Sequence, residues 1–171
     1  MKKVSVSIIA GDISRVKADA IITAINSGGM WFGGIDGVIQ RMAGNLFHQQ
    51  AAAMTLTDGQ TIVALSNGRA HKGAFTNVVF VVDDLKRPLH QIVFNGLKAA
   101  SDAGFKSVSL PTIRMGVMLG AVEKSVDEAV GEMAKGVNMF LCKNPDTALE
   151  NIAFVVYNDQ NIQLLLQKAL K

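Results

Sequence analysis

The chain has 171 residues, of which 49% are hydrophobic and 18% are charged, and its formal net charge is +3. This composition is typical of a compact globular protein and argues against disorder, and the length predicts a single domain over residues 1–171. No run of Lys and Arg stands out and no apolar run is long enough to span a bilayer, so we expect neither a membrane partner nor a dedicated nucleic-acid surface.

Cysteine usage suggests a location for the protein. The only cysteine is Cys142, so no internal disulfide can form. Because disulfides are rare in reducing compartments, this favours a cytoplasmic protein. Cys142 falls near the end of a predicted helix, where we expect a small buried hydrophobic residue rather than a reactive thiol.

The first part of the chain predicts two strands, a glycine-rich loop and a helix. Residues 4–9 alternate between polar and apolar types, which predicts a strand near a sheet edge. Residues 20–25 form an apolar run typical of a buried strand. After the loop, apolar residues recur at spacings of three and four and predict a helix: Ile35, Val38, Ile39 and Met42.

The rest of the chain continues this alternation of strands and helices. Further strands are predicted at residues 61–65, 77–82, 107–110 and 151–157. Further helices are predicted at residues 46–54, 89–103, 121–141 and 159–170. We expect His48, in the first of these helices, to be partly exposed and to have no ligand role. The alternation predicts an α/β fold whose largely parallel sheet is covered on both faces, with ligands beyond the carboxyl ends of its strands.

Common catalytic and cofactor motifs are absent. The sequence has no G-x-G-x-x-G after the first strand, no phosphate-binding G-K-[ST] motif and no G-x-S-x-G turn. Three scattered histidines and one cysteine offer no metal-ligand spacing, so we expect no metal and no cofactor. Asp83 and Asp84 resemble a metal or acid/base pair, but adjacent strand residues point to opposite faces, which favours a solvated strand end.

Residues 26–34, called here the first loop, lie between a strand and a helix. That order favours an anion site, because the first amides of a helix have no internal acceptor and carry the positive end of its dipole. Gly33 and Gly34 leave those amides accessible. Asp36, at the start of the helix, is either a structural cap or a catalytic carboxylate. Asp12, after the first strand, either caps a turn or accepts hydrogen bonds from a ligand amino group.

Residues 112–120, called here the second loop, repeat the order of strand, glycine-bearing loop and helix. Two such loops can approach a diphosphate from both sides.

Segments along essentially the whole chain, in the same order, resemble the macro domain family. They are Gly11-Asp12-Ile13, residues 19–26, Gly33-Gly34-Ile35-Asp36-Gly37-Val38-Ile39, Ala43-Gly44, residues 107–111 with Gly116-Val117, and residues 154–158.

The resemblance implies a three-layer α/β/α sandwich, with a mixed and largely parallel central sheet, that binds ADP-ribose. It implies that Asp12 accepts a hydrogen bond from the adenine amino group, that Tyr157 lies against the adenine ring, and that Asn26 hydrogen-bonds the terminal ribose. The residues it implies as offering main-chain amides near the diphosphate are Gly33, Gly34, Ile35, Gly116 and Val117. The predicted ligand-binding set also includes Ile13, Met118 and Asn158, which lie within or beside these segments.

Asp36-Gly37, with Asn26 upstream, resembles the hydrolytic branch of that family. Its members remove ADP-ribose from protein carboxylates or deacetylate O-acetyl-ADP-ribose, and they need no metal. The resemblance implies that Asp36 activates a water near the terminal ribose, which makes Asp36 and Asn26 the predicted catalytic residues. The implied partner is ADP-ribose, or a protein or metabolite that carries it.

Two alternatives to a hydrolase remain. A non-catalytic module that binds ADP-ribose is favoured by departures from the family pattern: Phe32 replaces a glycine, Arg114-Met115 replaces a Ser-Thr pair, and Met118 stands where an aromatic often packs on the ribose. An RNA or poly(A) binder is disfavoured, because the sequence lacks a basic surface with interspersed aromatic residues.

Overall fold

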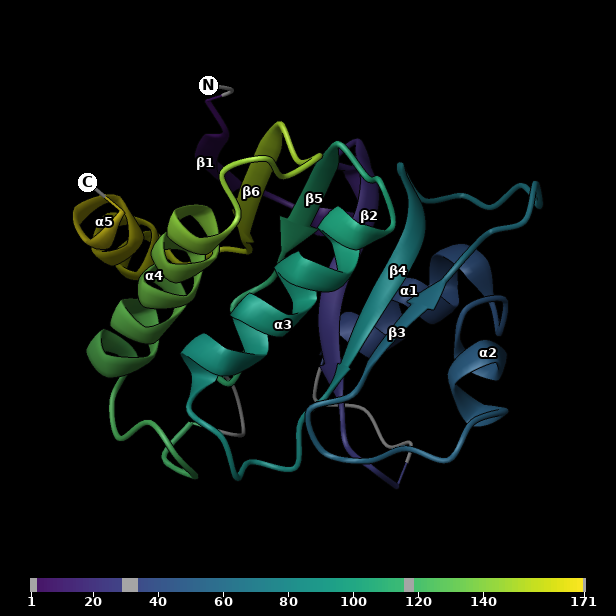
Figure 1. Ribbon diagram of the computed structural model, residues 1–171, viewed down its shortest axis with the longest axis horizontal. Helices are drawn as coiled ribbons and strands as arrows, with labels where there is room; N and C mark the ends of the chain where they lie inside the picture. Colours follow the sequence, from purple (N-terminus) through teal and green to yellow (C-terminus); the bar gives the residue numbers. More distant parts are fainter. Residues whose placement is uncertain (1–2, 29–33, 116–118, 171) are drawn as a thin grey trace.

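A six-stranded sheet with helices on both faces forms the centre of the computed structural model, which describes residues 3–28, 34–115 and 119–170 (Figure 1). The strands are β1 (Ser5–Ala10), β2 (Ala18–Ile25), β3 (Thr61–Ala64), β4 (Phe75–Val82), β5 (Ser107–Leu110) and β6 (Asn151–Val156). The helices are η1 (Ile13–Arg15, a 3-10 turn), α1 (Gly34–Ala43), α2 (His48–Ala52), α3 (Leu89–Asp102), α4 (Val126–Lys143) and α5 (Gln160–Ala169).

The strand order in the sheet is β1-β6-β5-β2-β4-β3. Every neighbouring pair is parallel except β3 with β4, which is antiparallel. The prediction of a mixed, largely parallel sheet is therefore confirmed, and β1 lies at an edge as its alternating pattern indicated.

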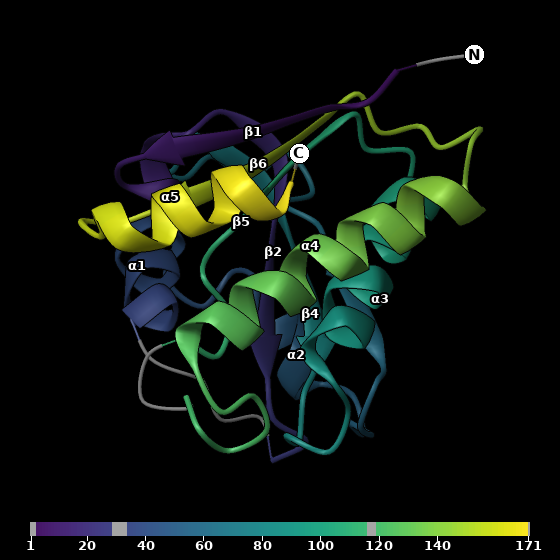
Figure 2. The ribbon, with the colours of Figure 1, turned by 90° about the vertical axis from the view of Figure 1, so that its left-hand side faces the viewer.

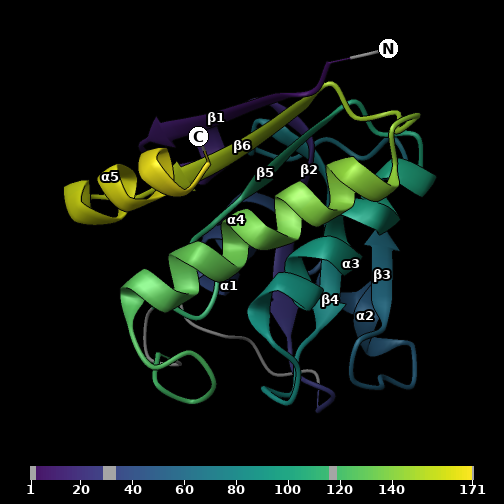
Figure 3. The same cartoon turned by 60° about the vertical axis from the view of Figure 1, so that its left-hand side comes forward.

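Two apolar layers hold the helices against the sheet, and the alternation of strand residues creates them. In β2, Ile21 and Ile25 pack toward the side of α1 and α2, whereas Ile22 and Ala24 pack toward α3 and α4. Figures 2 and 3 show α3 and α4 side by side on that second face, with α5 beside α4. This arrangement is a three-layer α/β/α sandwich, as predicted.

Helix α4 begins at Val126, five residues later than the sequence pattern predicted. Ser125 caps it, because the Ser125 hydroxyl accepts a hydrogen bond from the Glu128 amide at 3.1 Å. Just before the cap, the Gly120 amide donates to the Glu123 carbonyl at 2.9 Å, and Gly120 has a φ of +96°. The segment 120–124 therefore forms a turn instead of the first turn of the helix.

Two side chains lie differently from their predictions. His48 is only 7% exposed, and its ring centroid lies 5.9 Å from that of Phe80, because α2 turns His48 toward the sheet. Cys142 is exposed rather than buried. The inward side of α4 carries Met133, Val137 and Phe140, and a residue two positions beyond Phe140 faces away from that side.

The close packing of α4 on α3 leads to a first prediction, which compares two glycines in one helix. A methyl group added at Gly136 would lie 2.7 Å from the His90 carbonyl oxygen and 2.8 Å from Val93 Cβ, whereas at Gly131 it would meet nothing within 4 Å. Gly131→Ala should stabilise the protein by about 0.5–1 kcal/mol through helix propensity. Gly136→Ala should destabilise it by about 1–3 kcal/mol, because the His90 carbonyl oxygen belongs to the backbone and cannot move away without distorting it. Urea unfolding of both variants measures the difference, and equal effects would contradict the close contact.

Candidate functional site

The parallel strands all end at one edge of the sheet, and the segments that follow them carry the predicted site residues. The Gly11 amide donates to the Val156 carbonyl at 3.0 Å, so the segment after β1 lies beside the segment after β6. The Asp83 amide donates to the Ile25 carbonyl at 2.6 Å, so the segment after β4 lies beside the start of the first loop. Asp12 and Tyr157 thus form one end of the candidate site, and Asn26 belongs to another part of the same edge.

Asp12 caps the 3-10 turn η1. Its Oδ1 accepts hydrogen bonds from the Ser14 amide at 2.9 Å and from the Ser14 hydroxyl at 2.8 Å, while its Oδ2 lies 3.8 Å from Arg15 Nε. The hydrogen bond from the Ser14 hydroxyl, followed by that from the Ser14 amide, lowers the pKa of Asp12 below its usual value. Asp12 is therefore an ionised acceptor at neutral pH, and Ser14 occupies only one of its two oxygens.

Ile13 and the residues after β6 differ in what they can offer a ligand. The Ile13 side chain is buried in the core on the α1 side, which leaves its main chain for any ligand contact. Tyr157 is 78% exposed, so one large aromatic surface stands open at the end of β6. Asn158 adopts a φ of +52°, and the next residue, Asp159, caps α5 by accepting from the Ile162 amide at 3.0 Å. The turn that carries Tyr157 is therefore anchored on its C-terminal side by the cap of α5.

Asp84, which follows β4, holds the described start of the first loop through its carboxylate. The Ser27 amide donates to Asp84 Oδ1 at 2.8 Å, directly after Asn26. Asn26 is half-buried, and a methyl group added at Gly28 would lie 3.3 Å from Asn26 Oδ1. A glycine at position 28 thus leaves room for the Asn26 side chain.

Helix α1 begins at Gly34, as the predicted anion site requires. Ile35 is half-buried and packs on the core of that face, and Asp36 is the third residue of the helix. The first amides of such a helix have no acceptor within it. The other predicted loop residues, Gly33, Gly116, Val117 and Met118, lie outside the described residues, as does Phe32.

The prediction of a solvated strand end at Asp83 and Asp84 is wrong for Asp83, which is fully buried. Asp83 Oδ2 accepts from Arg114 Nε at 2.9 Å, and Asp83 Oδ1 accepts from Arg114 Nη2 at 2.6 Å. Arg114 Nη1 also donates to Glu123 Oε1 at 2.9 Å, so Asp83, Arg114 and Glu123 form a buried cluster, called here the arginine cluster. Burial acts to lower the pKa of Arg114, but the hydrogen bonds that its guanidinium donates to the two carboxylates raise that pKa above the usual value.

Sequence reasoning missed this cluster, because no local pattern connects residues 83, 114 and 123. The one available signal was a long charged side chain in the second loop where the family pattern has a small one.

Among the described residues, no group of three or more His, Cys, Asp or Glu side chains is arranged to hold a metal ion. No helix within the described ranges is long and apolar enough to cross a membrane.

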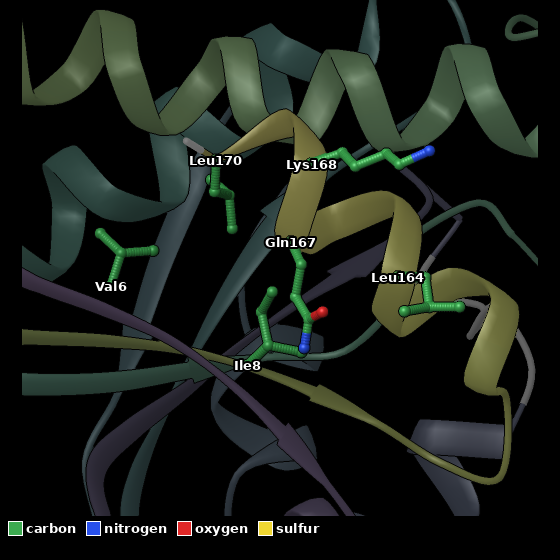
Figure 4. A pocket seen from close by; sticks show the side chains of 6 residues that line it. All are labelled: Val6, Ile8, Leu164, Gln167, Lys168 and Leu170. Atoms are coloured by element: carbon green, nitrogen blue, oxygen red, sulfur yellow. The ribbon is translucent and has the colours of Figure 1, made fainter.

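A separate groove lies between β1 and α5 (Figure 4). Its lining is mostly apolar: Val6, Ile8, Leu164, Gln167, Lys168 and Leu170. Because none of the predicted site residues contributes to it, this groove is distinct from the candidate site.

Comparisons with known proteins show which proteins this chain resembles. No family model matches the chain. An Escherichia fergusonii protein named O-acetyl-ADP-ribose deacetylase is 29% identical over 174 residues, which cover 95% of this chain and 93% of that protein. An uncharacterised Thermotoga maritima protein is 27% identical over 95% of this chain, which spans only 28% of that longer protein.

A solved structure supplies the comparison of folds. The Trypanosoma brucei macrodomain, crystallised in complex with ADP-ribose, superposes with a TM-score of 0.80 at 20% identity, over 97% of this chain and 69% of that one. The chain therefore has the fold of the macrodomain structures and is similar over nearly its whole length to proteins named O-acetyl-ADP-ribose deacetylase.

Proposed function

We propose that the protein binds ADP-ribose and hydrolyses ADP-ribosyl esters, either O-acetyl-ADP-ribose or ADP-ribose attached to protein carboxylates. The observation that carries the proposal is the pairing of an ionised Asp12 with an exposed Tyr157 on adjacent strand ends, in a macro domain fold. The name of the E. fergusonii relative and the ligand of the T. brucei structure support it.

The proposed ligand lies along the carboxyl edge of the sheet. Its adenine stacks on Tyr157, an interaction worth about 1–3 kcal/mol, and its amino group donates to Asp12. The diphosphate lies near the start of α1, where main-chain amides and the helix dipole favour negative charge. The terminal ribose then lies near Asn26 and Asp36.

The proposed reaction needs neither a metal nor a cofactor. Asp36 takes a proton from a bound water, and the resulting hydroxide attacks the ester carbonyl carbon. The bond from that carbon to the ribose oxygen breaks, the ribose oxygen regains a proton, and the products are a carboxylic acid and ADP-ribose. Asn26 holds the ribose so that the ester faces the water.

Calorimetric titration with ADP-ribose and AMP tests binding. We expect ADP-ribose to bind more tightly than AMP, because the diphosphate adds charge-assisted hydrogen bonds to main-chain amides. Absence of binding by ADP-ribose, or equal affinity for the two ligands, would refute the proposed arrangement.

The adenine end leads to a sharper prediction at Asp12. Asp12→Asn keeps an oxygen for Ser14 but places an amide NH₂ where, in the proposed complex, the second carboxylate oxygen accepts from the adenine amino group. Its affinity for ADP should fall about tenfold or more, because the adenine amino group loses a charged acceptor. IDP carries an oxygen in place of that amino group, so the preference of the unmodified protein for ADP over IDP should vanish or invert.

Asp12→Ala is the matched comparison for stability. Ser14 is 2% exposed, and this substitution leaves its amide and hydroxyl without their acceptor. The free energy of unfolding should therefore fall by about 1–3 kcal/mol, while Asp12→Asn changes it by less than about 0.5 kcal/mol. If Asp12→Asn leaves the preference for ADP over IDP unchanged, Asp12 is a structural cap and not an adenine ligand.

A further inference from the structure

Arg114 lies in the second loop, yet its guanidinium group is fully occupied within the protein. Nε and Nη2 donate to Asp83 at 2.9 and 2.6 Å, Nη2 also donates to the Arg87 carbonyl at 2.8 Å, and Nη1 donates to both Glu123 oxygens at 2.9 and 3.2 Å. These contacts engage all three nitrogens of the guanidinium group. Because the side chain is also only 1% exposed, Arg114 cannot itself bind a phosphate.

The partners of Arg114 come from three different parts of the chain. Asp83 follows β4, Arg87 lies just before α3, and Glu123 precedes α4. Glu123 Oε2 also accepts from the Leu89 amide at 3.0 Å, which caps the first turn of α3. The arginine cluster thus fixes the described start of the second loop, at Arg114, to the end of the sheet and to the start of a long helix.

The backbone of Arg114 indicates that this attachment holds it in an unfavourable conformation. Its φ is +64°, in the left-handed region that residues with a Cβ atom rarely adopt. Such a conformation persists only where the surrounding contacts over-determine it. The buried hydrogen bonds of the arginine cluster supply those contacts.

The neighbouring residue, Asp84, serves the first loop. Asp84 Oδ1 accepts from the Ser27 amide at 2.8 Å, and the Asp84 amide donates to Asp58 Oδ1 at 3.0 Å. Adjacent residues at a strand end point in opposite directions, so the two carboxylates after β4 reach two different loops. One dipeptide therefore anchors the described start of each loop.

We propose that Arg114 is a positioning residue that, through Asp83, sets the main chain of residues 112–115, the described start of the second loop, and thereby contributes to the preference for a diphosphate over a monophosphate. This inference rests on the proposed binding of ADP-ribose and assigns the altered residue of the second loop a role in that binding. Asp84, the neighbour of Asp83, ties the described start of the first loop, at Ser27, to the same strand end.

The test compares the affinities for ADP and AMP in Arg114→Lys and in Arg87→Lys. A lysine at 114 keeps the charge but cannot reproduce the planar, forked hydrogen bonds, so the affinity for ADP should fall about tenfold while that for AMP changes by less than about threefold. Arg87 forms an ion pair with Asp58 at 3.0 Å at the same end of the sheet, and its side chain is 47% exposed. Arg87→Lys should change neither affinity by more than about threefold.

A general loss of folded protein would lower both affinities equally, and such a result would overturn the positioning role. Glu123→Gln provides a second, milder variant: it keeps an acceptor for the Leu89 amide and leaves Arg114 paired with Asp83. We expect its effect on ADP to be smaller than that of Arg114→Lys and in the same direction. If neither Arg114→Lys nor Glu123→Gln changes the ratio of ADP affinity to AMP affinity, the proposal is also refuted.

Hydrogen exchange in the ligand-free protein distinguishes failure of this inference from failure of the proposed function. Arg114→Lys should speed exchange of the amides of Ile113 and Met115 at least tenfold relative to the Arg87→Lys control, because these amides lie in the segment that Arg114 holds. If the unmodified protein binds no ADP-ribose but exchange increases, the proposed function fails and the anchoring role stands. If exchange does not change, the anchoring role is refuted whatever the protein binds.

Discussion

Asp36→Ala is expected to abolish hydrolysis of O-acetyl-ADP-ribose while leaving ADP-ribose binding intact. Activation of water by a positioned carboxylate contributes typically about 10²–10⁴-fold to rate, so the loss should be large. Binding should survive or tighten, because the substitution removes a negative charge near the proposed position of the diphosphate. The third position of α1, where Asp36 lies, is also where a carboxylate favours the helix dipole, so a structural role is the competing explanation.

Single-turnover release of acetate, together with calorimetric titration of ADP-ribose, separates these explanations. The matched control is Asp127→Ala, which removes an exposed carboxylate from the first turn of α4. It should lower stability slightly, by about 0.3–1 kcal/mol, and leave turnover unchanged. If Asp36→Ala costs only about 0.5–2 kcal/mol of stability and the folded protein still turns over, Asp36 is a cap. If the unmodified protein binds ADP-ribose tightly without turnover, the protein is a non-catalytic ADP-ribose-binding module.

The fold was largely predictable because its elements carry strong local patterns. The apolar run of β2 indicated a buried strand, and the helical spacing of Ile92, Val93 and Leu97 after Pro88 indicated α3 and its start at Leu89. The start of α4 was misjudged, because apolar spacing extends through a turn that only the Ser125 cap ends. Periodicity alone also could not say which side of the short helix α2 faces inward, which explains the error at His48.

The candidate site was predictable only where its residues follow strand ends. The resemblance placed Asp12 and Tyr157 at the same end of a ligand, and the hydrogen bond from Gly11 to Val156 shows that the segments carrying them are adjacent. Their roles toward a ligand stay predictions, as do those of Asn26 and Asp36. The arginine cluster was unpredictable, since Asp83 and Arg114 meet through the order of the strands and not through any spacing in the sequence.

Asp83→Ala is expected to destabilise the fold far more than Asp84→Ala, although the two residues are adjacent and chemically identical. Asp83 is fully buried, and its removal leaves the Arg114 guanidinium, only 1% exposed, with one carboxylate partner instead of two. Removing one member of a buried ion pair typically costs about 3–5 kcal/mol, because a charge remains without compensation in a region of low polarity.

Asp84 is half-buried and accepts one main-chain hydrogen bond, from the Ser27 amide, so its loss should cost about 0.5–1.5 kcal/mol. Guanidinium unfolding of both variants, with m-values compared to verify two-state behaviour, measures the two costs. Small and equal losses would restore the interpretation of a solvated strand end. A large loss confined to Asp83→Ala would instead show that the strand end after β4 contributes to stability through the arginine cluster, and that the residues beside the candidate ligand site also hold the fold together.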